Sequence, residues 1–176
     1  MSWGERTEVP LILLRHAKAV AREDWLGEDE DRPLSQQGQL ESTRMIQLYR
    51  NYGIKKIVSS DAIRCLDTVK PLSFECAIPI EATSKLREET YKKNRDKVEK
   101  FTEKLLDQIR EERVPVLVCG HNPVLPFMLK LLLKKSDIEM PDYKLQPGDG
   151  WVIYMKKRAK RLDFHPIHPL ENQTLA

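Results

Sequence analysis

The chain has 176 residues, of which 40% are hydrophobic and 32% are charged, with a formal net charge of +3. This length suits one domain with a single sizeable core, and the composition excludes both a disordered chain and an integral membrane protein. The longest apolar stretch, Val124 to Leu133, contains Pro126 and Lys130 and is much shorter than the roughly 18 residues that predict a membrane span. The small net charge does not indicate a nucleic-acid polymer as partner, and no membrane partner is expected.

The N-terminus and the cysteines indicate the compartment. The first eight residues are polar and include acids, so they lack the basic start and apolar centre of a secretory signal. The three cysteines are an odd number without a Cys-x-x-Cys pair, which argues against a disulfide framework and against a zinc site. We therefore expect a cytoplasmic protein with reduced cysteines. Its predicted organisation is a polar tail at 1–8, a single domain at 9–168 and a second tail at 169–176.

In chain order, apolar runs bounded by turn residues alternate with amphipathic stretches. This alternation predicts strands and helices around a largely parallel sheet, and therefore an α/β fold. The acidic segment Ala21 to Asp31, which follows the first strand, is predicted to be a loop. The predicted strands are Leu11 to Leu14, Ile54 to Val58, Ile78 to Ile80 and Val114 to Val118, followed by a closing hairpin of Trp151 to Met155 and Leu162 to Phe164.

Four helices are predicted between these strands. Ser35, the polar cluster at 59–61 and Asn122 offer side chains that cap helix N-termini, and Gly53 is of the type that ends a helix. Pro71 predicts a kink or an end in the second helix, and apolar residues at spacings of three and four place one face of the third helix on the sheet. The predicted bounds are Ser35 to about Tyr52, about Ala62 towards Pro71, Lys92 to Arg113, and Asn122 to about Lys134.

Three of the predicted strand ends carry cationic or imidazole side chains. Arg15 and His16 follow the first strand, Arg64 lies in the helical turn after the second, and His121 follows the strand that begins at Val114. Ligands of open α/β sheets bind beyond the C-terminal ends of the strands, so these side chains should share one edge. Arginine suits bidentate phosphate binding, and free N–H groups at the following helix N-termini add an anion site without a metal. The combination predicts a site for a phosphoryl group.

The two histidines can divide the chemistry between them. A neutral imidazole can attack phosphorus while a protonated one holds the oxygens, and on this basis His16 is the predicted nucleophile. Taken singly, each residue has an ordinary structural explanation: a histidine after a strand is more often a hydrogen-bonded structural residue, and a lone arginine is more often a solvated charge. Only their joint occurrence at neighbouring strand ends favours the functional interpretation.

The segments that hold these residues resemble known motifs. Leu13-Leu14-Arg15-His16-Ala17 resembles the Arg-His-Gly motif of the histidine phosphatase superfamily, also called the phosphoglycerate-mutase-like family. The segment 58–68, which contains Arg64, is similar to the second arginine motif of that family, and the segment 118–123, which contains His121, is similar to its second-histidine motif. The order and spacing of the three segments agree as well.

Further segments resemble particular branches of the family. Asp31-Arg32-Pro33-Leu34-Ser35, followed by Gly38, resembles the small SixA-type phosphohistidine phosphatases. Trp25-Leu26-Gly27-Glu28-Asp29 and Val124-Leu125-Pro126 are similar to the phosphatase domain found downstream of a Nudix (MutT-like) hydrolase in some actinobacterial proteins. The likeness covers about Val9 to Pro166.

The resemblance implies a three-layer α/β/α sandwich and a phosphoenzyme mechanism. The two arginines, Arg15 and Arg64, and His121 would bind the phosphoryl oxygens while His16 attacks and becomes a phosphohistidine, which water then hydrolyses. Larger family members use a carboxylate in a Leu-x-Glu context after the second arginine motif as general acid. Leu86-Arg87-Glu88 matches that context. Glu88 is therefore the candidate acid.

Two alternatives to this assignment of the acid stay open. Glu89 is adjacent and could take the role instead. Both carboxylates could also simply flank an exposed charged segment, because SixA-type members lack that acid. Lys18, two residues after His16, adds positive potential over the pocket unless it is solvated, and Asn122 is assigned as a further substrate contact.

The sequence departs from the family pattern at two points. Ala17 replaces the usual glycine of the first motif, but alanine is small enough to let the backbone approach a phosphate closely. No Nudix-like segment precedes Val9, so the sequence is interpreted either as a free-standing phosphatase or as a piece of a longer protein.

The leading functional hypothesis is a phosphatase for a small phosphorylated molecule, and the Nudix-linked likeness favours a nucleotide. The first rival is a phosphohistidine protein as substrate, because a short chain without large insertions leaves the pocket open. A mutase is disfavoured because it needs a more enclosed site. A non-catalytic phosphate-binding module is the rival from another class. The implied chemistry needs no metal and no cofactor, and the acidic loop lacks the ordered spacing of a calcium site.

Overall fold

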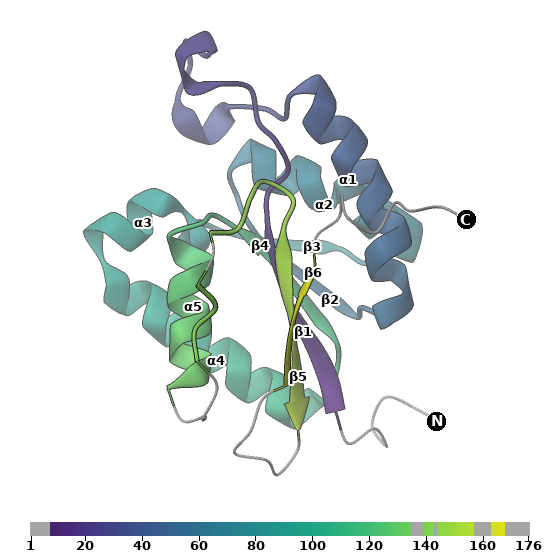
Figure 1. The fold of residues 1–176 in the computed structure, drawn as a ribbon. Coiled ribbons are helices and arrows are strands. Elements are labelled where there is room, and N and C mark those ends of the chain that lie inside the picture. The colour runs from purple at the N-terminus through teal and green to yellow at the C-terminus, as the bar shows by residue number, and fades with distance from the viewer. Residues whose placement is uncertain (1–7, 135–138, 143, 157–162, 168–176) are drawn as a thin grey trace.

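A single mixed sheet organises the chain. The computed structural model describes residues 8–134, 139–142, 144–156 and 163–167. Within them, six strands pair in the order β3-β2-β4-β1-β5-β6 (Figure 1). The pairs among β1 to β4 are parallel, whereas β5 is antiparallel to both β1 and β6. The strands are β1 (Glu8–Arg15), β2 (Lys56–Ser60), β3 (Ile80–Thr83), β4 (Val116–Gly120), β5 (Gly150–Lys156) and β6 (Asp163–Ile167).

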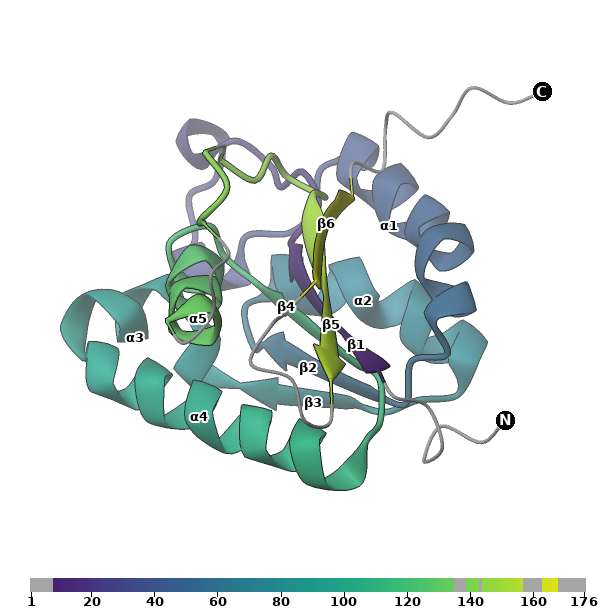
Figure 2. The same ribbon diagram turned by 60° about the horizontal axis from the view of Figure 1, so that its bottom comes forward.

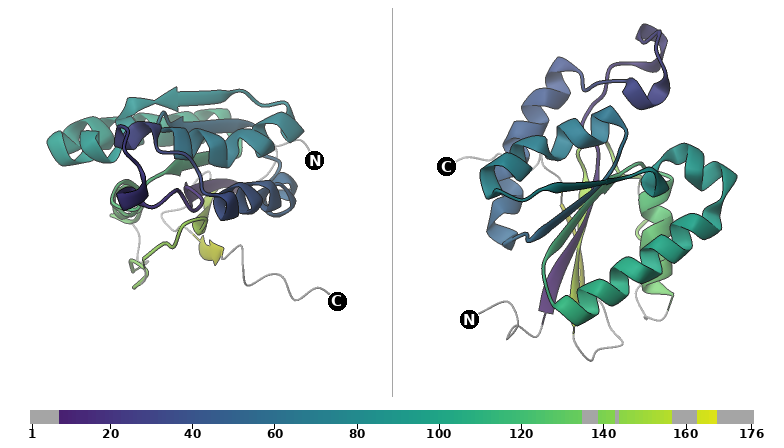
Figure 3. Two further views of the ribbon diagram at one scale, coloured as in Figure 1. Left: turned by 90° about the horizontal axis from the view of Figure 1, so that it is seen from above. Right: turned by 180° about the vertical axis from the view of Figure 1, so that it is seen from behind.

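Helices cover both faces of this sheet. In Figure 1 α1 and α2 lie on one side of it, and α3, α4 and α5 lie on the other; the turned views of Figures 2 and 3 show the same division. The expected three-layer α/β/α arrangement with a mainly parallel sheet is therefore confirmed. None of the helices in the described part of the chain is long and apolar enough to cross a membrane. The helices are α1 (Gln36–Tyr49), α2 (Ile63–Cys76), α3 (Glu88–Lys93), α4 (Arg95–Glu112) and α5 (Val124–Leu133).

The alternation of side chains along β1 explains the two layers of core. Leu11 and Leu13 belong to the apolar cluster under α4 and α5, whereas Ile12 and Leu14 belong to the cluster under α1 and α2. All four are at most 1% exposed. Successive residues of a strand point to opposite faces, so a strand that is covered on both sides is apolar throughout. This burial fixes the strand's register and hence the place where Arg15 and His16 emerge.

The N-terminus of α1 is docked directly beside the end of β1. Ser35 caps the helix by accepting a hydrogen bond from the Gly38 N–H at 3.1 Å, as predicted. Its own N–H and hydroxyl both donate to the Lys18 carbonyl, at 2.9 and 3.0 Å. A Cβ at position 38 would lie 2.0 Å from that same carbonyl oxygen, so only glycine fits there. This explains the glycine at position 38, and the contact ties α1 to the chain just after His16.

Several predicted boundaries are wrong, and the differences have physical causes. Strands β2, β3 and β4 begin and end about two residues later than expected. Apolar content alone misplaced them, because Ser59 and Ser60 are polar yet fully buried within β2. Pro71 does not end α2, which continues to Cys76. A proline costs one backbone hydrogen bond, and the buried Val69 and Leu72 beside it keep the helix against the sheet.

Two helix starts also differ from the prediction. The segment expected to be one helix from Lys92 to Arg113 is divided into α3 and α4, because the Asn94 side chain caps α4 through the Lys97 N–H at 3.2 Å. Asn122 does not cap α5. The carbonyl of His121 accepts from the first N–H groups of that helix instead, at 3.0 to 3.1 Å. The turn of the closing hairpin, at 157–162, lies outside the described residues, but its strands pair as expected.

Candidate active site

Four of the predicted residues form the floor of a site at the C-terminal edge of the parallel strands. We use "the floor" for Arg15, His16, Arg64 and His121. The ring centroids of His16 and His121 are 5.3 Å apart, and Arg64 Nη2 lies 3.4 Å from His121 Nδ1. His16, Arg64 and His121 are at most 6% exposed. The neighbouring strand ends thus bring together residues that are up to 106 positions apart, from Arg15 to His121.

His16 is held as a neutral imidazole with one nitrogen free. Its Nδ1 lies 2.8 Å from the Ala17 carbonyl oxygen, and because a carbonyl only accepts, Nδ1 must carry the proton. The lone pair of Nε2 is then the nucleophilic site of the ring. Burial, followed by the neighbouring His121 and the two arginines of the floor, lowers the pKa of His16 to about 3, although its bond to Ala17 acts in the opposite direction.

Ala17 fills the place of the family glycine without strain. It is fully buried, and its N–H donates to Thr68 Oγ1 at 2.9 Å. The Thr68 hydroxyl in turn donates to the Arg64 carbonyl at 2.7 Å. This chain of two bonds couples the backbone beside the nucleophile to the first turns of α2. Thr68 was not assigned a role from the sequence, although it lies in the second arginine motif.

His121 is fixed by side chains from β2 and α2. Its Nε2 lies 3.1 Å from Ser60 Oγ and 3.5 Å from Cys65 Sγ, while its Nδ1 faces Arg64 and Glu88. The ring therefore presents Nδ1 to the centre of the site. Neither Ser60 nor Cys65 was recognised as a supporting residue from the sequence, because a polar residue in a buried strand carries no local signal of what it contacts.

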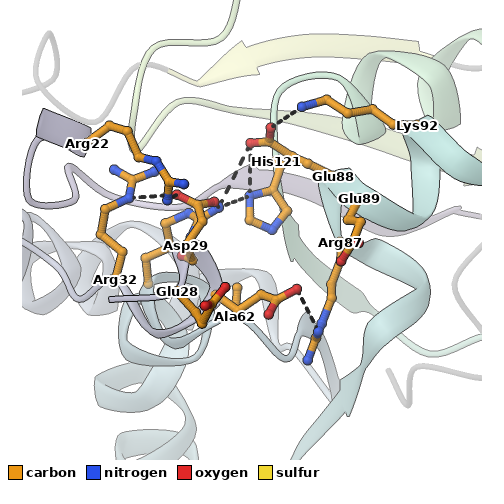
Figure 4. A pocket seen from close by; sticks show the side chains of 12 residues that line it. Arg22, Glu28, Asp29, Arg32, Ala62, Arg87, Glu88, Glu89, Lys92 and His121 are labelled. Carbon is orange, nitrogen blue, oxygen red and sulfur yellow. Dashed lines mark hydrogen bonds and ion pairs between the residues drawn. The ribbon is translucent and has the colours of Figure 1, made fainter. Parts of the chain in front are cut away.

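The Arg64 guanidinium is bound by the acidic segment. Its Nη2 donates to Asp29 Oδ2 at 2.9 Å, and its Nη1 donates to the Asp29 carbonyl. The other carboxylate oxygen, Oδ1, accepts from Arg22 Nη1 at 2.6 Å and from Arg32 Nε at 3.0 Å (Figure 4). Partial burial alone would raise the pKa of Asp29, but the three arginines outweigh it and lower that pKa.

We use "the wall" for Asp29, Glu30, Arg87 and Glu88, which border the site on the side away from His16. Glu30, next to Asp29, pairs with Arg87 at 2.8 Å, and Arg87 forms a bidentate pair with Asp61 at 2.5 and 2.9 Å. The segment 21–31 was predicted to be a loop; it contains two short 3-10 turns, and these ion pairs tie it to the body. It is the purple projection at the top of Figure 1.

A cavity of about 540 Å³ lies between floor and wall (Figure 4). His16 and Arg15 of the floor are not among its lining residues. Both signs of charge are represented about equally. The lining residues are Arg22, Glu28, Asp29, Glu30, Arg32, Ala62, Arg64, Arg87, Glu88, Glu89, Lys92 and His121.

The structure separates the two carboxylates that the sequence left as alternatives. Glu88 Oε1 lies 3.5 Å from His121 Nδ1 and 4.0 Å from Arg64 Nη2, and in Figure 4 its side chain is directed at His121. Glu89 instead pairs with Lys93 at 2.5 Å, away from the floor. That hydrogen bond and the charge of Lys93 lower the pKa of Glu89, which favours a permanently ionised carboxylate.

Three residues predicted as substrate contacts, Arg15, Lys18 and Asn122, are not among the residues that line this cavity. Arg15 donates from Nη1 to the Leu145 carbonyl, and burial lowers its pKa against the opposing charges of Glu88 and Asp149. Lys18 Nζ donates to Gln37 at 2.9 Å on α1. Asn122 lines a separate, mostly apolar cavity of about 380 Å³, with its Oδ1 buried and without a hydrogen-bond partner among the described residues.

No group of three or more His, Cys, Asp or Glu side chains in the described residues is arranged to hold a metal ion. The positive charge in the site comes from the guanidiniums of the floor and from the cations on the rim of the cavity. Chemically, the arrangement offers a neutral imidazole nucleophile, cationic donors for an anion beside it, and one carboxylate within reach of the same place.

Comparisons with known proteins relate the chain to phosphatases. The sequence profile of the histidine phosphatase superfamily (branch 1) matches residues 11–94. An 8-oxo-(d)GTP phosphatase of Mycolicibacterium smegmatis is 24% identical over 143 residues, which cover 81% of this chain and 43% of that protein. The chain thus spans less than half the length of this relative.

Solved structures share the fold. The protein histidine phosphatase SixA, solved with tungstate, superposes with a TM-score of 0.72 at 19% identity, covering 93% of this chain and 99% of the other. A mycobacterial glucosyl-3-phosphoglycerate phosphatase superposes with a TM-score of 0.69 at 14% identity, covering 90% and 98%. The profile match over residues 11–94, the shared fold and the motif residues gathered at one sheet edge all relate the chain to the histidine phosphatase superfamily.

Proposed function

We propose that this phosphatase hydrolyses a phosphomonoester or phosphoanhydride of a small molecule through a phosphohistidine intermediate on His16, without a metal ion. The observation that carries the proposal is the state of His16. Its Nδ1 is committed to the Ala17 carbonyl at 2.8 Å, and its lowered pKa keeps Nε2 unprotonated at neutral pH. A free imidazole lone pair beside cationic donors is the arrangement that attack on a bound phosphoryl group needs.

The proposed reaction has two steps. Arg15, Arg64 and His121 bind the phosphoryl oxygens, and His16 Nε2 attacks phosphorus in line while the bond from phosphorus to the leaving oxygen breaks. Glu88 gives its proton to that oxygen. In the second step water attacks the phosphohistidine, the Glu88 carboxylate takes a proton from the water, and inorganic phosphate leaves with His16 neutral again. Glu88 suits this role because it is the carboxylate near His121 Nδ1, at 3.5 Å.

A nucleotide is the small-molecule substrate that we place first. Support comes from the 8-oxo-(d)GTP phosphatase of Mycolicibacterium smegmatis, whose sequence matches 81% of this chain. A phosphohistidine protein is the second candidate, since the fold of the protein histidine phosphatase SixA covers 93% of the chain and the cavity opens to solvent between exposed side chains such as Lys92 and Arg22. The domain that would carry the activity is predicted to span 9–168.

The test is phosphate release from a panel of nucleotides, sugar phosphates and a phosphohistidine protein in excess EDTA, comparing wild type with His16→Ala. We expect release by wild type alone, and acid-labile, base-stable labelling of wild type when a labelled substrate is quenched during turnover. Because His16 is buried, His16→Asn serves as a second variant of similar volume. Equal release by wild type and both variants would overturn the assignment of His16, and dependence on an added divalent cation would overturn the metal-free mechanism.

A further inference from the structure

The orientation of Arg64 depends on one carboxylate outside the family motifs that hold the floor. A guanidinium carries five N–H groups in a fixed plane, so fixing one edge of it fixes where the others point. Arg64 is 2% exposed, and its Nη1 and Nη2 both donate to Asp29, to the carbonyl and to Oδ2 respectively. Arg64 Nε has no hydrogen-bond partner among the described residues. Asp29 is therefore the anion that sets the plane of this buried cation.

Asp29 is itself held from the opposite side. Its Oδ1 accepts from Arg22 at 2.6 Å and from Arg32 at 3.0 Å, and its neighbour Glu30 is anchored to Arg87 at 2.8 Å. A carboxylate shared by three guanidiniums has little freedom to rotate, and its lowered pKa keeps it charged at neutral pH. The segment 21–31 thus holds Asp29 in a fixed position against Arg64.

Arg64 Nη2 also lies close to two other residues of the site. Nη2 lies 3.4 Å from His121 Nδ1 and 4.0 Å from Glu88 Oε1, so the N–H of Nη2 that Asp29 does not use is directed to the place where the phosphoryl group would bind. We propose that Asp29 is a positioning residue, which acts through Arg64 by fixing the guanidinium so that its free N–H groups bind the phosphoryl oxygens. This inference rests on the proposed function, because it takes Arg64 as a phosphoryl ligand.

The contact between Asp29 and Arg64 also has an opposite interpretation, and the experiment must distinguish between the two. A carboxylate on an anion-binding guanidinium could compete with the phosphoryl group, in which case removing its charge would tighten anion binding. Under the positioning role, removing the charge leaves Arg64 less well oriented and weakens anion binding. The bond from Arg64 Nη1 to the Asp29 carbonyl favours positioning, because a phosphoryl group cannot displace the backbone as it can a side chain.

The decisive variant is Asp29→Asn, with orthovanadate as the probe of anion binding and a phosphate ester that wild type hydrolyses as substrate. We expect the dissociation constant of orthovanadate to rise about tenfold and kcat to fall about tenfold, as is usual when a supporting partner of an active-site ligand is lost. Asp29→Glu should recover part of both. Asp31→Asn is the matched control, because Asp31 lies in the same short turn, is exposed, and has no ion pair in the described structure.

A double-mutant cycle with Arg64→Met separates positioning from mere support of the fold. If Asp29 acts through Arg64, Asp29→Asn should change orthovanadate binding by less than about twofold once Arg64 is Met. A full tenfold loss in that background would overturn the inference, as would tighter orthovanadate binding by Asp29→Asn in the wild-type background. Wild-type binding by Arg64→Met alone would instead overturn the phosphate-binding role of Arg64, on which the proposed function depends.

Discussion

The floor and the wall of the site are held in place by different kinds of interaction. His16, Arg64 and His121 are buried and come from strand ends or the helix after them, and the two imidazoles are fixed by bonds to backbone or to buried side chains. Asp29 and Glu88 are more than a third exposed, lie in a short 3-10 turn and at the start of the short helix α3, and form ion pairs. Exposed ion pairs contribute little one at a time, so the wall depends on several acting together. The floor is therefore suited to the chemical steps, and the wall is suited to orienting the groups of the site and to admitting the substrate.

The largest difference should appear between a residue of the floor and a residue on the exposed rim of the cavity when each is truncated. His121→Ala removes a buried donor to the phosphoryl group and should lower kcat/KM by about 10³-fold, the usual effect of losing one preorganised donor. Lys92→Ala, at a cavity-lining lysine whose side chain is 72% exposed, should lower it by no more than about threefold.

Steady-state kinetics with one phosphate ester would measure both effects, with thermal unfolding to verify that each variant folds. A loss in Lys92→Ala as large as in His121→Ala would mean that the cavity rim takes part in binding the reacting group, against the division between floor and wall.

Glu88 is the residue of the wall that is proposed to take part in the reaction. The effect of replacing it should therefore depend on the leaving group of the substrate. Glu88→Gln should lower kcat about 10²-fold for an alkyl phosphate, which needs its leaving oxygen protonated, and much less for p-nitrophenyl phosphate, whose leaving oxygen does not. Glu89→Gln is the matched control one residue away; because Glu89 pairs with Lys93 instead of facing His121, its kcat should stay near that of wild type.

Measuring kcat for both esters in both variants tests this assignment directly. A loss for Glu89→Gln that depends on the leaving group, with Glu88→Gln unaffected, would exchange the two roles. Equal losses for both esters in Glu88→Gln would point to a structural contribution of Glu88 instead of proton transfer.

The same substitution, glycine to alanine, should act differently in the support of the floor and in the segment of the wall. At Gly38 a Cβ would meet the Lys18 carbonyl at 2.0 Å, and neither backbone segment can move without loosening the chain beside His16. Gly38→Ala should therefore lower the free energy of unfolding by about 3 kcal/mol. At Gly27 the Cβ would meet only the Trp25 ring, at 3.0 Å, in an exposed segment where a side chain can shift.

Gly27→Ala should accordingly change stability by less than about 0.5 kcal/mol. Urea denaturation of the two variants beside wild type makes the comparison. Equal stability of Gly38→Ala and wild type would show that the contact between α1 and the chain after β1 is not as close as described.

The floor and the wall also differ in how far they could be predicted from the sequence. The residues of the floor could be found because buried strands end where their apolar runs end, and the strand ends of a parallel sheet meet at one edge. The two-residue shift of β2 did not matter, since Arg64 lies in the following helix either way. Ala17, which stands in place of the glycine of the first motif, is fully buried.

The wall could not be predicted in the same way. The segment 21–31 holds six acids, and nothing in their local order distinguishes Asp29, which meets Arg64, from Asp31, which is exposed. Which acid pairs with a buried arginine 35 positions away is decided by tertiary placement. Glu88 was identified only through the motif resemblance. Lys18 was expected to lie over the pocket, but its Nζ donates to Gln37 of α1, which is docked beside it.

The smallest predicted effect is on stability instead of rate: His16 of the floor should make the free energy of unfolding depend on pH. His16 has a pKa of about 3 in the folded protein, whereas an unfolded histidine titrates near 6.5. A lowered pKa in the folded state means that protonation favours unfolding, so the contribution is fully present above about pH 6.5 and is lost as the pH falls towards 3. Between pH 7.5 and 5.5 only the unfolded chain gains the proton, which lowers the free energy of unfolding by about 1.4 kcal/mol.

His16→Asn tests this, because asparagine has a similar size and does not titrate in this range. Urea denaturation at pH 7.5 and 5.5 should show that wild type loses about 1.4 kcal/mol more than the variant. The same titration should leave His16 neutral in the folded enzyme at both pH values, so an acid limb of kcat/KM near pH 6.5 should not come from the nucleophile. Equal losses in both proteins would mean that His16 is protonated as readily in the folded floor as in the unfolded chain, and its role as a neutral nucleophile would need a separate source of deprotonation.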